Sequence, residues 1–287
     1  RQLALFYLII GAITIGFALV LVRLSQVGPI STGFWRVAIA FPILTLLSMR
    51  QGSTLPNDEE IPAFKDYLWV LFSGILFGGD LATWHLSIHF TSIANSTLLA
   101  NVSPVIIALW GWLVLGKTPK KKLIIGLLLA IFGIAILIHP SLHMNQNTRI
   151  GDSLALITAF FYAGYLLVLN RARRKFTTFS SMALSTFASM LTLLLITLIS
   201  GEAFIPTTET AWLVLIALAL FAHILGQGLI AYALPYLSVT FSSTALLIQP
   251  MVAAMAGWFF FSEHLGAIQI IGIFIALIGI FLAKQTI

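Results

Sequence analysis

Two titratable side chains, Asp80 and His223, stand within long apolar stretches of the sequence. A charge near the centre of a bilayer costs at least about 2.5–3.5 kcal/mol unless it meets a partner or water, so such residues mark candidate sites. At 1.5 Å per residue, each lies roughly 15 Å from the end of its apolar stretch. We expect them to face one another as a proton-coupled pair or an amine-binding site. The alternative is a buried pair that only joins two parts of the chain.

Trp84 and His85 extend the candidate site around Asp80. Trp84 follows Asp80 by four residues, which puts both on one helix face, where a carboxylate and an indole suit an ammonium group. This pair favours a cationic or zwitterionic substrate. The alternative is that Trp84 packs or faces lipid, as aromatic residues in membrane helices often do. His85 lies one position further round the helix and either lines an outer vestibule or bonds to a neighbouring carbonyl.

Arg36 and Gln227 are further candidates, each within an apolar stretch. Arg36 is expected about 9 Å below the outer surface. There it would receive a substrate carboxylate, or else snorkel or pair with Asp80. Gln227 follows His223 by four residues and continues its helix face. Tyr162 either joins the site or only packs.

Two prolines, Pro104 and Pro250, interrupt apolar stretches and predict helix breaks. Each frees a backbone carbonyl one turn earlier, and free backbone groups at membrane depth are tolerated where they line a cavity. Asn101 lies one turn beyond Thr97 and leads toward the first break, which gives a polar stripe. We expect Asn101 to bind substrate there, while a bend used only for packing is the alternative.

The elements that position these residues are predicted to be membrane helices. The chain of 287 residues is 60% hydrophobic and 8% charged, with a mean hydropathy of +1.05, which is too apolar for a soluble domain. At about 20 residues per span, it has room for about ten. We therefore predict an all-α membrane protein of ten transmembrane helices, near 3–24, 30–49, 67–89, 92–115, 120–138, 152–170, 178–199, 211–234, 238–261 and 267–283.

Most basic residues fall on one side when these spans alternate. The crowded side holds Arg1, Arg50, Lys65, Lys117, Lys120, Lys121, Lys122, Arg171, Arg173, Arg174, Lys175 and Lys284. The other side holds Arg23 and Arg149. By the positive-inside rule, both termini face the cytoplasm of a bacterial inner membrane. The net charge of +6 therefore reports topology, and a nucleic-acid partner is not expected. The alternative use is an electrostatic anchor for anionic lipid at Lys117–Lys122 and Arg171–Lys175.

The chain repeats itself at an offset of 146 residues. In the first copy the matching positions are Ser92, Ser96, Pro104, Gly111, Trp112, Gly126, Ala130 and Gly133. In the second they are Ser238, Ser242, Pro250, Gly257, Trp258, Gly272, Ala276 and Gly279. We predict five-helix repeats over 1–138 and 152–287, joined by a loop over 139–151. Because five is odd, the second repeat is inverted relative to the first, and inverted repeats suit alternating access around a central site.

Small residues form a stripe on the last helix of each predicted repeat. The stripes contain Gly126 and Gly133 in the first repeat and Gly272 and Gly279 in the second. Such faces permit close helix approach, so we expect them to serve packing first. A homodimer through the same faces is a second hypothesis.

The sequence resembles the drug/metabolite transporter superfamily, EamA type. The resemblance rests on Ser92-x-x-x-Ser96, the mid-helix Pro104, the Gly111-Trp112 pair and their second-half copies, and it covers the whole chain. It implies ten helices, inverted halves and small organic substrates that are often exported. A glutamate commonly closes the fourth and ninth helices of such proteins. Here Glu263 keeps that position in the second half, whereas the first half has Lys117.

Signals for other chemistry are weak. The segment 111–118 satisfies the P-loop pattern, but its middle residues are bulky, apolar and within a predicted span, so nucleotide binding is not expected. There is no cysteine, which excludes disulfides and thiolate chemistry. We expect no catalytic residue, cofactor or metal. An intramembrane enzyme that uses Asp80 and His223 is one alternative, and a channel-like or lipid-binding protein is another.

We therefore predict a secondary transporter that exports small amine-bearing or amphipathic metabolites, such as amino acids. Its partners would be the substrate, membrane lipid and, if transport is proton-coupled, protons. A central cavity between the repeats would bind the substrate through Arg36, Asp80, Trp84, His85, Asn101, His223 and Gln227.

Overall fold

The computed structural model describes residues 2–51, 62–116, 121–142, 146–237, 242–243, 245–246, 248–263 and 266–284. The regular structure of this part is helical throughout, which confirms the all-α prediction there. The first half holds α1 (Gln2–Leu24), α2 (Pro29–Gln51), α3 (Phe64–Phe90), α4 (Ile93–Ala100), α5 (Ser103–Leu113) and α6 (Lys121–Leu142). The second half holds α7 (Gln146–Ala172), α8 (Thr178–Ser200), α9 (Glu209–Ala217), the π-helix η1 (Leu218–Gln227), α10 (Gly228–Ala233), the 3₁₀-helix η2 (Leu234–Tyr236), α12 (Ile248–Phe261) and α13 (Ala267–Lys284).

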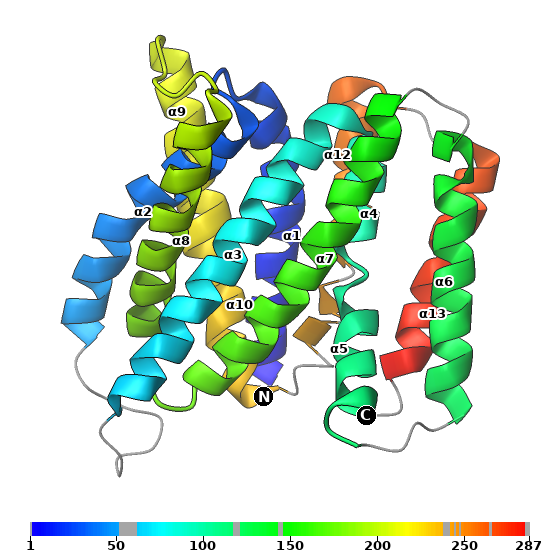
Figure 1. Cartoon of the computed structure of the whole chain (residues 1–287), viewed down its shortest axis with the longest axis horizontal. Helices are drawn as coiled ribbons and strands as arrows, with labels where there is room; N and C mark the ends of the chain where they lie inside the picture. The colour runs from blue at the N-terminus through cyan, green and yellow to red at the C-terminus, as the bar shows by residue number, and fades with distance from the viewer. Residues whose placement is uncertain are drawn as a thin grey trace.

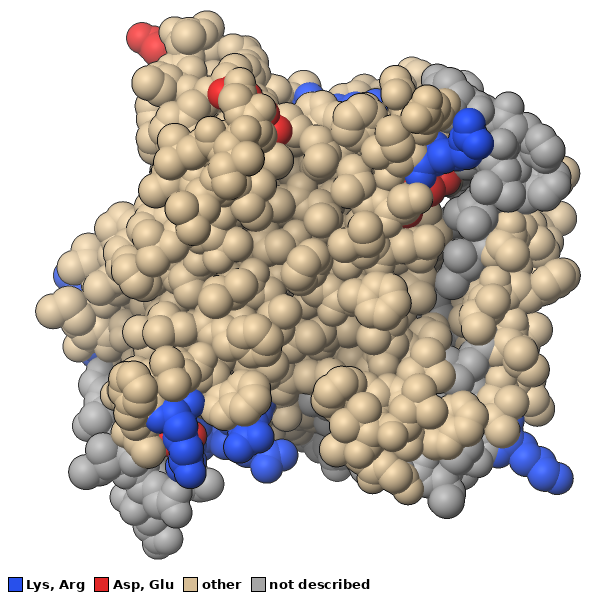
Figure 2. Space-filling model, viewed as in Figure 1, with Lys and Arg blue, Asp and Glu red and all other residues tan. Residues whose placement is uncertain are grey.

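Seven helical segments of the described chain are long and apolar enough to cross a membrane. They are Gln2–Leu24, Pro29–Gln51, Phe64–Phe90, Ile93–Leu113, Gln146–Ala172, Thr178–Ser200 and Glu209–Tyr236. Shorter apolar helices cover Ile124–Gly133, Ile248–Phe261 and Ala267–Gly279. Large apolar side chains such as Phe17, Leu195 and Phe259 are exposed on these helices, and the visible face in Figure 2 is largely uncharged across its middle. A belt of this kind matches the hydrocarbon core of a bilayer.

The helices form one bundle, with one pair of helices at its side that packs on α4, α5 and α7 (Figure 1). In the bundle, α3 packs on α7 and α8, α2 packs on α8, and α1 packs on η1, α10 and α12. Helices α4 and α5 pack on α7. The pair is formed by α6 and α13, which lie side by side (Figure 1).

The break predicted at Pro104 is present in the structure. Helix α4 ends at Ala100 and α5 begins at Ser103, so Pro104 sits in the first turn of a new helix, where its missing N–H costs no hydrogen bond. Asn101 ends α4, and its backbone N–H donates to Thr97 O at 3.0 Å. In the second half, α12 begins at Ile248, just before Pro250. The polar residues beside the two prolines, Asn101 and Gln249, are both buried inside the bundle.

The glycine stripes on α6 and α13 face each other within the chain. A Cβ added at Gly133 would lie 2.3 Å from Ala276 N, and one added at Gly279 would lie 2.2 Å from Ala130 N. Only glycine permits this backbone approach. The prediction that small residues serve close packing fits this contact. The dimer hypothesis needs a correction, because each stripe is covered by the other and neither is free for a second copy of the chain.

Helix α1 begins and α13 ends at the same end of the molecule (Figure 1), which we call the basic end. The described basic residues at this end are Arg50, Lys65, Lys121, Lys122, Arg171, Arg173, Arg174, Lys175 and Lys284. Arg1, Lys117, Lys120 and residues 238–241, which the predictions also used, lie outside the described residues. Helices α6 and α7 both extend into the predicted connection at 139–151, so that connection is shorter than expected.

At the opposite end of the molecule, two glutamates accept hydrogen bonds from backbone N–H groups at helix N-termini. Glu202 accepts hydrogen bonds from Ile30 N and Ser31 N at the start of α2. Glu263 accepts from Ile93 N at the start of α4 and pairs with Arg23 at 3.4 Å. Negative charge at a helix N-terminus is stabilising because it meets unpaired N–H groups there. These contacts join helices from both halves of the chain.

Candidate functional site

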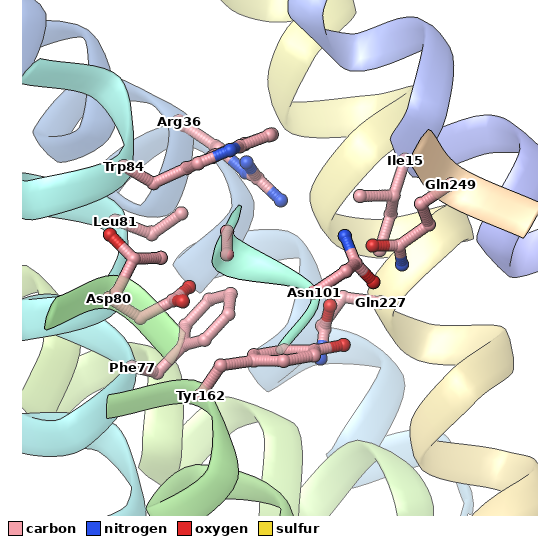
Figure 3. A pocket seen from close by; sticks show the side chains of 12 residues that line it. Ile15, Arg36, Phe77, Asp80, Leu81, Trp84, Asn101, Tyr162, Gln227 and Gln249 are labelled. Atoms are coloured by element: carbon pink, nitrogen blue, oxygen red, sulfur yellow. The ribbon is translucent and has the colours of Figure 1, made fainter. Parts of the chain in front are cut away.

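A cavity lies inside the bundle at the point where α4 breaks (Figure 3). Its lining residues come from α1, α2, α3, α7, η1, α12 and the α4–α5 break, so both halves of the chain contribute. It offers about 40 Å³ to the centres of water-sized molecules, which is room for a few waters at roughly 10–15 Å³ each. The lining residues are Ile15, Arg36, Phe77, Asp80, Leu81, Trp84, Ala100, Asn101, Thr158, Tyr162, Gln227 and Gln249.

Arg36 and Asp80 bring opposite charges to this cavity. Arg36 is 1% exposed and Asp80 is 7% exposed. The Nε and Nη1 atoms of Arg36 are buried and have no hydrogen-bond partner in the structure. The two side chains point toward the same space (Figure 3) but form no ion pair with each other. The predicted Arg36–Asp80 pairing is therefore not what the structure shows, and Arg36 does not snorkel to the surface.

Trp84 and Asp80 lie one turn apart on α3, and both line the cavity, as their spacing predicts. The Trp84 indole Nε1 is buried and has no hydrogen-bond partner. Close packing holds this face of α3 in place. A Cβ at Gly74 would lie 2.1 Å from Ser185 O on α8, and one at Gly79 would lie 2.7 Å from the Phe161 ring on α7. The glycines of α3 thus let its other faces pack closely on α7 and α8, while Asp80 and Trp84 line the cavity.

Amide and phenol side chains gather across the cavity from Asp80 (Figure 3). Asn101 comes from the α4–α5 break, Gln227 from the end of η1, Gln249 from α12 and Tyr162 from α7. Gln227 Nε2 donates to the Tyr165 hydroxyl at 2.9 Å, which fixes its amide. The cavity therefore has a charged side and an uncharged polar side.

The two predicted histidines do not line this cavity. His85 is fully buried, and its Nδ1 lies 3.2 Å from Pro29 O at the start of α2. His223 Nε2 lies 2.8 Å from Thr186 Oγ1 on α8, and its ring centroid is 5.6 Å from that of Phe77. His223 thus contacts a cavity residue without reaching the cavity itself. The expected face-to-face arrangement of Asp80 and His223 is not formed.

Gln249 is a site residue that the sequence patterns did not indicate. For Tyr162 they left open whether it joins the site or only packs. Gln249 directly precedes Pro250 and is a polar residue within an apolar run, which was an available signal. Ile15, Phe77 and Thr158 carry no such signal, because an apolar or hydroxyl residue in a membrane helix fits packing equally well.

Two segments of the chain, residues 2–139 and 149–284, each match the EamA-like transporter family. A transporter of Archaeoglobus fulgidus described as uncharacterised is 25% identical over 282 residues, which cover 94% of this chain and 93% of the relative. The pseudopaline exporter CntI of Pseudomonas aeruginosa is 25% identical over 239 residues, or 83% of this chain and 80% of the relative.

A solved crystal structure has the same fold, with a TM-score of 0.68, 17% sequence identity and coverage of 99% of this chain and 96% of that chain. Family matches span nearly all of the sequence, and the structure supplies apolar helices around a buried polar cavity. The chain therefore belongs to the EamA-like transporter family, and the protein is a membrane transporter rather than an enzyme.

Proposed function

We propose that the protein is a secondary transporter that exports a small zwitterionic metabolite, such as an amino acid, through the central cavity. The observation that carries this proposal is the presence of Arg36 and Asp80 in one buried cavity without a bond between them. A buried charge without a protein partner is costly, and such residues in membrane proteins usually serve a pathway or a ligand.

A zwitterion matches both charges. Its carboxylate would accept hydrogen bonds from Nε and Nη1 of Arg36, which have no protein acceptor. Its ammonium group would lie between the carboxylate of Asp80 and the indole of Trp84, where charge and cation–π attraction act together. Each hydrogen bond to a charged group contributes about 1.5–3 kcal/mol, or roughly 10- to 150-fold in affinity.

Ten spans in two inverted halves would let this cavity, which has room only for a few waters in the structure, widen for the substrate and face each side in turn. The packing supports this arrangement, because contacts recur at the 146-residue offset: α3 packs on α7 as α1 packs on η1 and α10, and α5 packs on α7 as α12 packs on α1. The Gly133–Ala276 contact has its counterpart in Gly279–Ala130. The site between inverted repeats would then alternate by rocking of one half against the other.

The proposal also covers the orientation of the protein in the membrane and the direction of transport. The basic end would face the cytoplasm of a bacterial inner membrane, in agreement with the positive-inside rule. Substrate would enter from that end and leave past Arg23 and Glu263, whose ion pair joins the two halves at the opposite end. The similarity to an exporter of Pseudomonas aeruginosa supports outward transport. Protonation of a cavity carboxylate, Asp80, would couple transport to a proton gradient.

Vesicle transport tests this function. Purified protein is reconstituted, and exchange of amino acids is compared with exchange of the matching amines and carboxylic acids, with and without a pH gradient. We expect saturable exchange of amino acids only. Asp80→Asn should reduce it by roughly 10- to 150-fold, whereas the exposed control Glu209→Gln at the start of α9 should leave it unchanged. Full activity of Asp80→Asn would refute its role, and a lack of amino-acid exchange would refute the substrate class.

A further inference from the structure

The uncharged side of the cavity differs from the charged side in its side chains and, except for Asn101, in the half of the chain that supplies them. Asn101, Gln227 and Gln249 are 5%, 1% and 6% exposed, so three amides are buried around one small space. Figure 3 shows them across from Asp80, with Tyr162 beside them. Most buried polar groups in proteins are hydrogen-bonded, so a cluster of this kind needs an explanation.

Two of the amides are held by protein partners. Asn101 Nδ2 donates to Thr97 O at 2.9 Å, and Gln227 Nε2 donates to the Tyr165 hydroxyl. Each amide therefore has a fixed orientation, with hydrogen-bonding capacity left over. These contacts fix the amides of Asn101 and Gln227 on one side of the cavity before any substrate binds.

Gln249 differs from the other two. Its Nε2 is buried without a hydrogen-bond partner, and so is the hydroxyl of Tyr162. The Tyr162 hydroxyl lies near the amides of Gln249 and Gln227, but neither contact reaches hydrogen-bond geometry within the described part of the chain. An unsatisfied donor and an unsatisfied hydroxyl thus line the same side of the cavity.

Apart from Asn101, which comes from the α4–α5 break in the first half, the two sides of the cavity belong to different halves of the chain. Arg36, Asp80 and Trp84 come from the first half, on α2 and α3. Gln249 and Tyr162 come from the second half, on α12 and α7. A substrate held by its charged groups on one side would present the rest of its structure to the other half.

We infer that Gln249 and Tyr162 bind the side chain of the substrate and select amino acids whose side chains form hydrogen bonds. This inference rests on the proposed function, because it assumes that Arg36 and Asp80 hold the α-carboxylate and α-ammonium groups. A polar side chain satisfies the Gln249 amide and the Tyr162 hydroxyl. An aliphatic side chain of the same size leaves both unpaired in a buried site, which disfavours it on the order of 10- to 100-fold.

Near-isosteric substrate pairs test this selection. Competition between asparagine and leucine, and between threonine and valine, is measured in reconstituted vesicles with alanine as the labelled substrate. Asparagine and threonine should compete at least about 10-fold better than their aliphatic partners. In Gln249→Met, which keeps the length of the side chain, this preference should fall to within about twofold.

Controls separate this inference from the proposed function. Tyr162→Phe removes only the hydroxyl and should weaken the preference several-fold, whereas the exposed Gln146→Leu at the start of α7 should leave it unchanged. A preference for leucine and valine in the wild-type protein would overturn the inference, and so would an unaltered preference in both cavity variants. In either case, continued exchange of alanine would leave the proposed function intact. If the wild-type protein exchanges no amino acid, the proposed function itself fails.

Discussion

Two buried arginines, in different regions of the molecule, have opposite surroundings. Arg173, at the basic end just after α7, is 4% exposed and donates to Ala231 O at 3.1 Å, to Thr178 Oγ1 at 2.8 Å and to Phe176 O. Burial lowers its pKa to about 10, so it remains charged near neutral pH. Arg36, in the central cavity, is buried as deeply, but two of its nitrogens have no acceptor.

The difference separates a structural charge from a functional one. Arg173 ties the turn after α7 to α10, and its hydrogen bonds offset the cost of burial. Arg36 makes no comparable set of hydrogen bonds, so its burial destabilises the fold. Retention of such a residue is explained when the missing acceptor belongs to the substrate. Loss of Arg36 should therefore affect transport, and loss of Arg173 should affect stability.

Arg36→Gln should have the largest effect on transport. Without the guanidinium, the substrate carboxylate loses two charge-assisted hydrogen bonds, so exchange should fall by at least about 100-fold. The midpoint of thermal unfolding should stay the same or rise, because an unpaired buried charge is removed. The exchange rate is measured in vesicles, and the unfolding midpoint is measured in detergent. Arg50→Gln, exposed at the end of α2, is the matched control and should change neither.

Arg173→Gln should give the opposite pattern. The variant loses charge-assisted hydrogen bonds and leaves the carbonyls of Ala231 and Phe176 without this donor, so the free energy of unfolding should fall by about 2–3 kcal/mol. The substrate concentration at half-maximal exchange should not change. The neighbouring Arg174 is exposed, and Arg174→Gln should leave stability unaffected. Loss of substrate affinity in Arg173→Gln without loss of stability would erase the distinction between the two arginines.

A third region, the α6–α13 contact, extends the comparison to an uncharged structural site. The Cβ in Gly133→Ala would meet the backbone of α13, which cannot move aside as a side chain does, so stability should fall by about 1–3 kcal/mol. Selectivity among substrates should be retained. Gly111→Ala is the control, because a Cβ there meets nothing within 4 Å. Equal unfolding midpoints for the two alanine variants would contradict the close packing of α6 and α13.

Much of this architecture follows from sequence patterns. Apolar runs predict the helices, and Pro104 predicts the break at which Asn101 reaches the cavity. Residue type and depth indicate Arg36 and Asp80, helical spacing adds Trp84, Asn101 and Gln227, and all five line the same cavity.

The predicted places of His85 and His223 are wrong for a physical reason. Depth along a helix is set by residue number, but rotation about the helix axis is not. His223 and Gln227 are both buried in the π-helix η1, but they bond to different helices: His223 to Thr186 on α8 and Gln227 to Tyr165 on α7. Gln227 lines the cavity, and His223 bonds to Thr186 instead. The hydrogen bond of His85 to Pro29 O depends on how α2 and α3 meet, which no local pattern encodes.

Ligand-induced thermal stabilisation tests the central claim most directly, because a ligand that binds only the native state raises the unfolding midpoint by mass action. The protein is titrated with alanine, with ethylamine, which lacks the carboxylate, and with propionate, which lacks the amine. We predict that only alanine raises the midpoint, and that Arg36→Gln and Asp80→Asn each abolish this rise. Equal stabilisation by ethylamine, or an undiminished effect of alanine on both variants, would contradict a cavity built for a zwitterion.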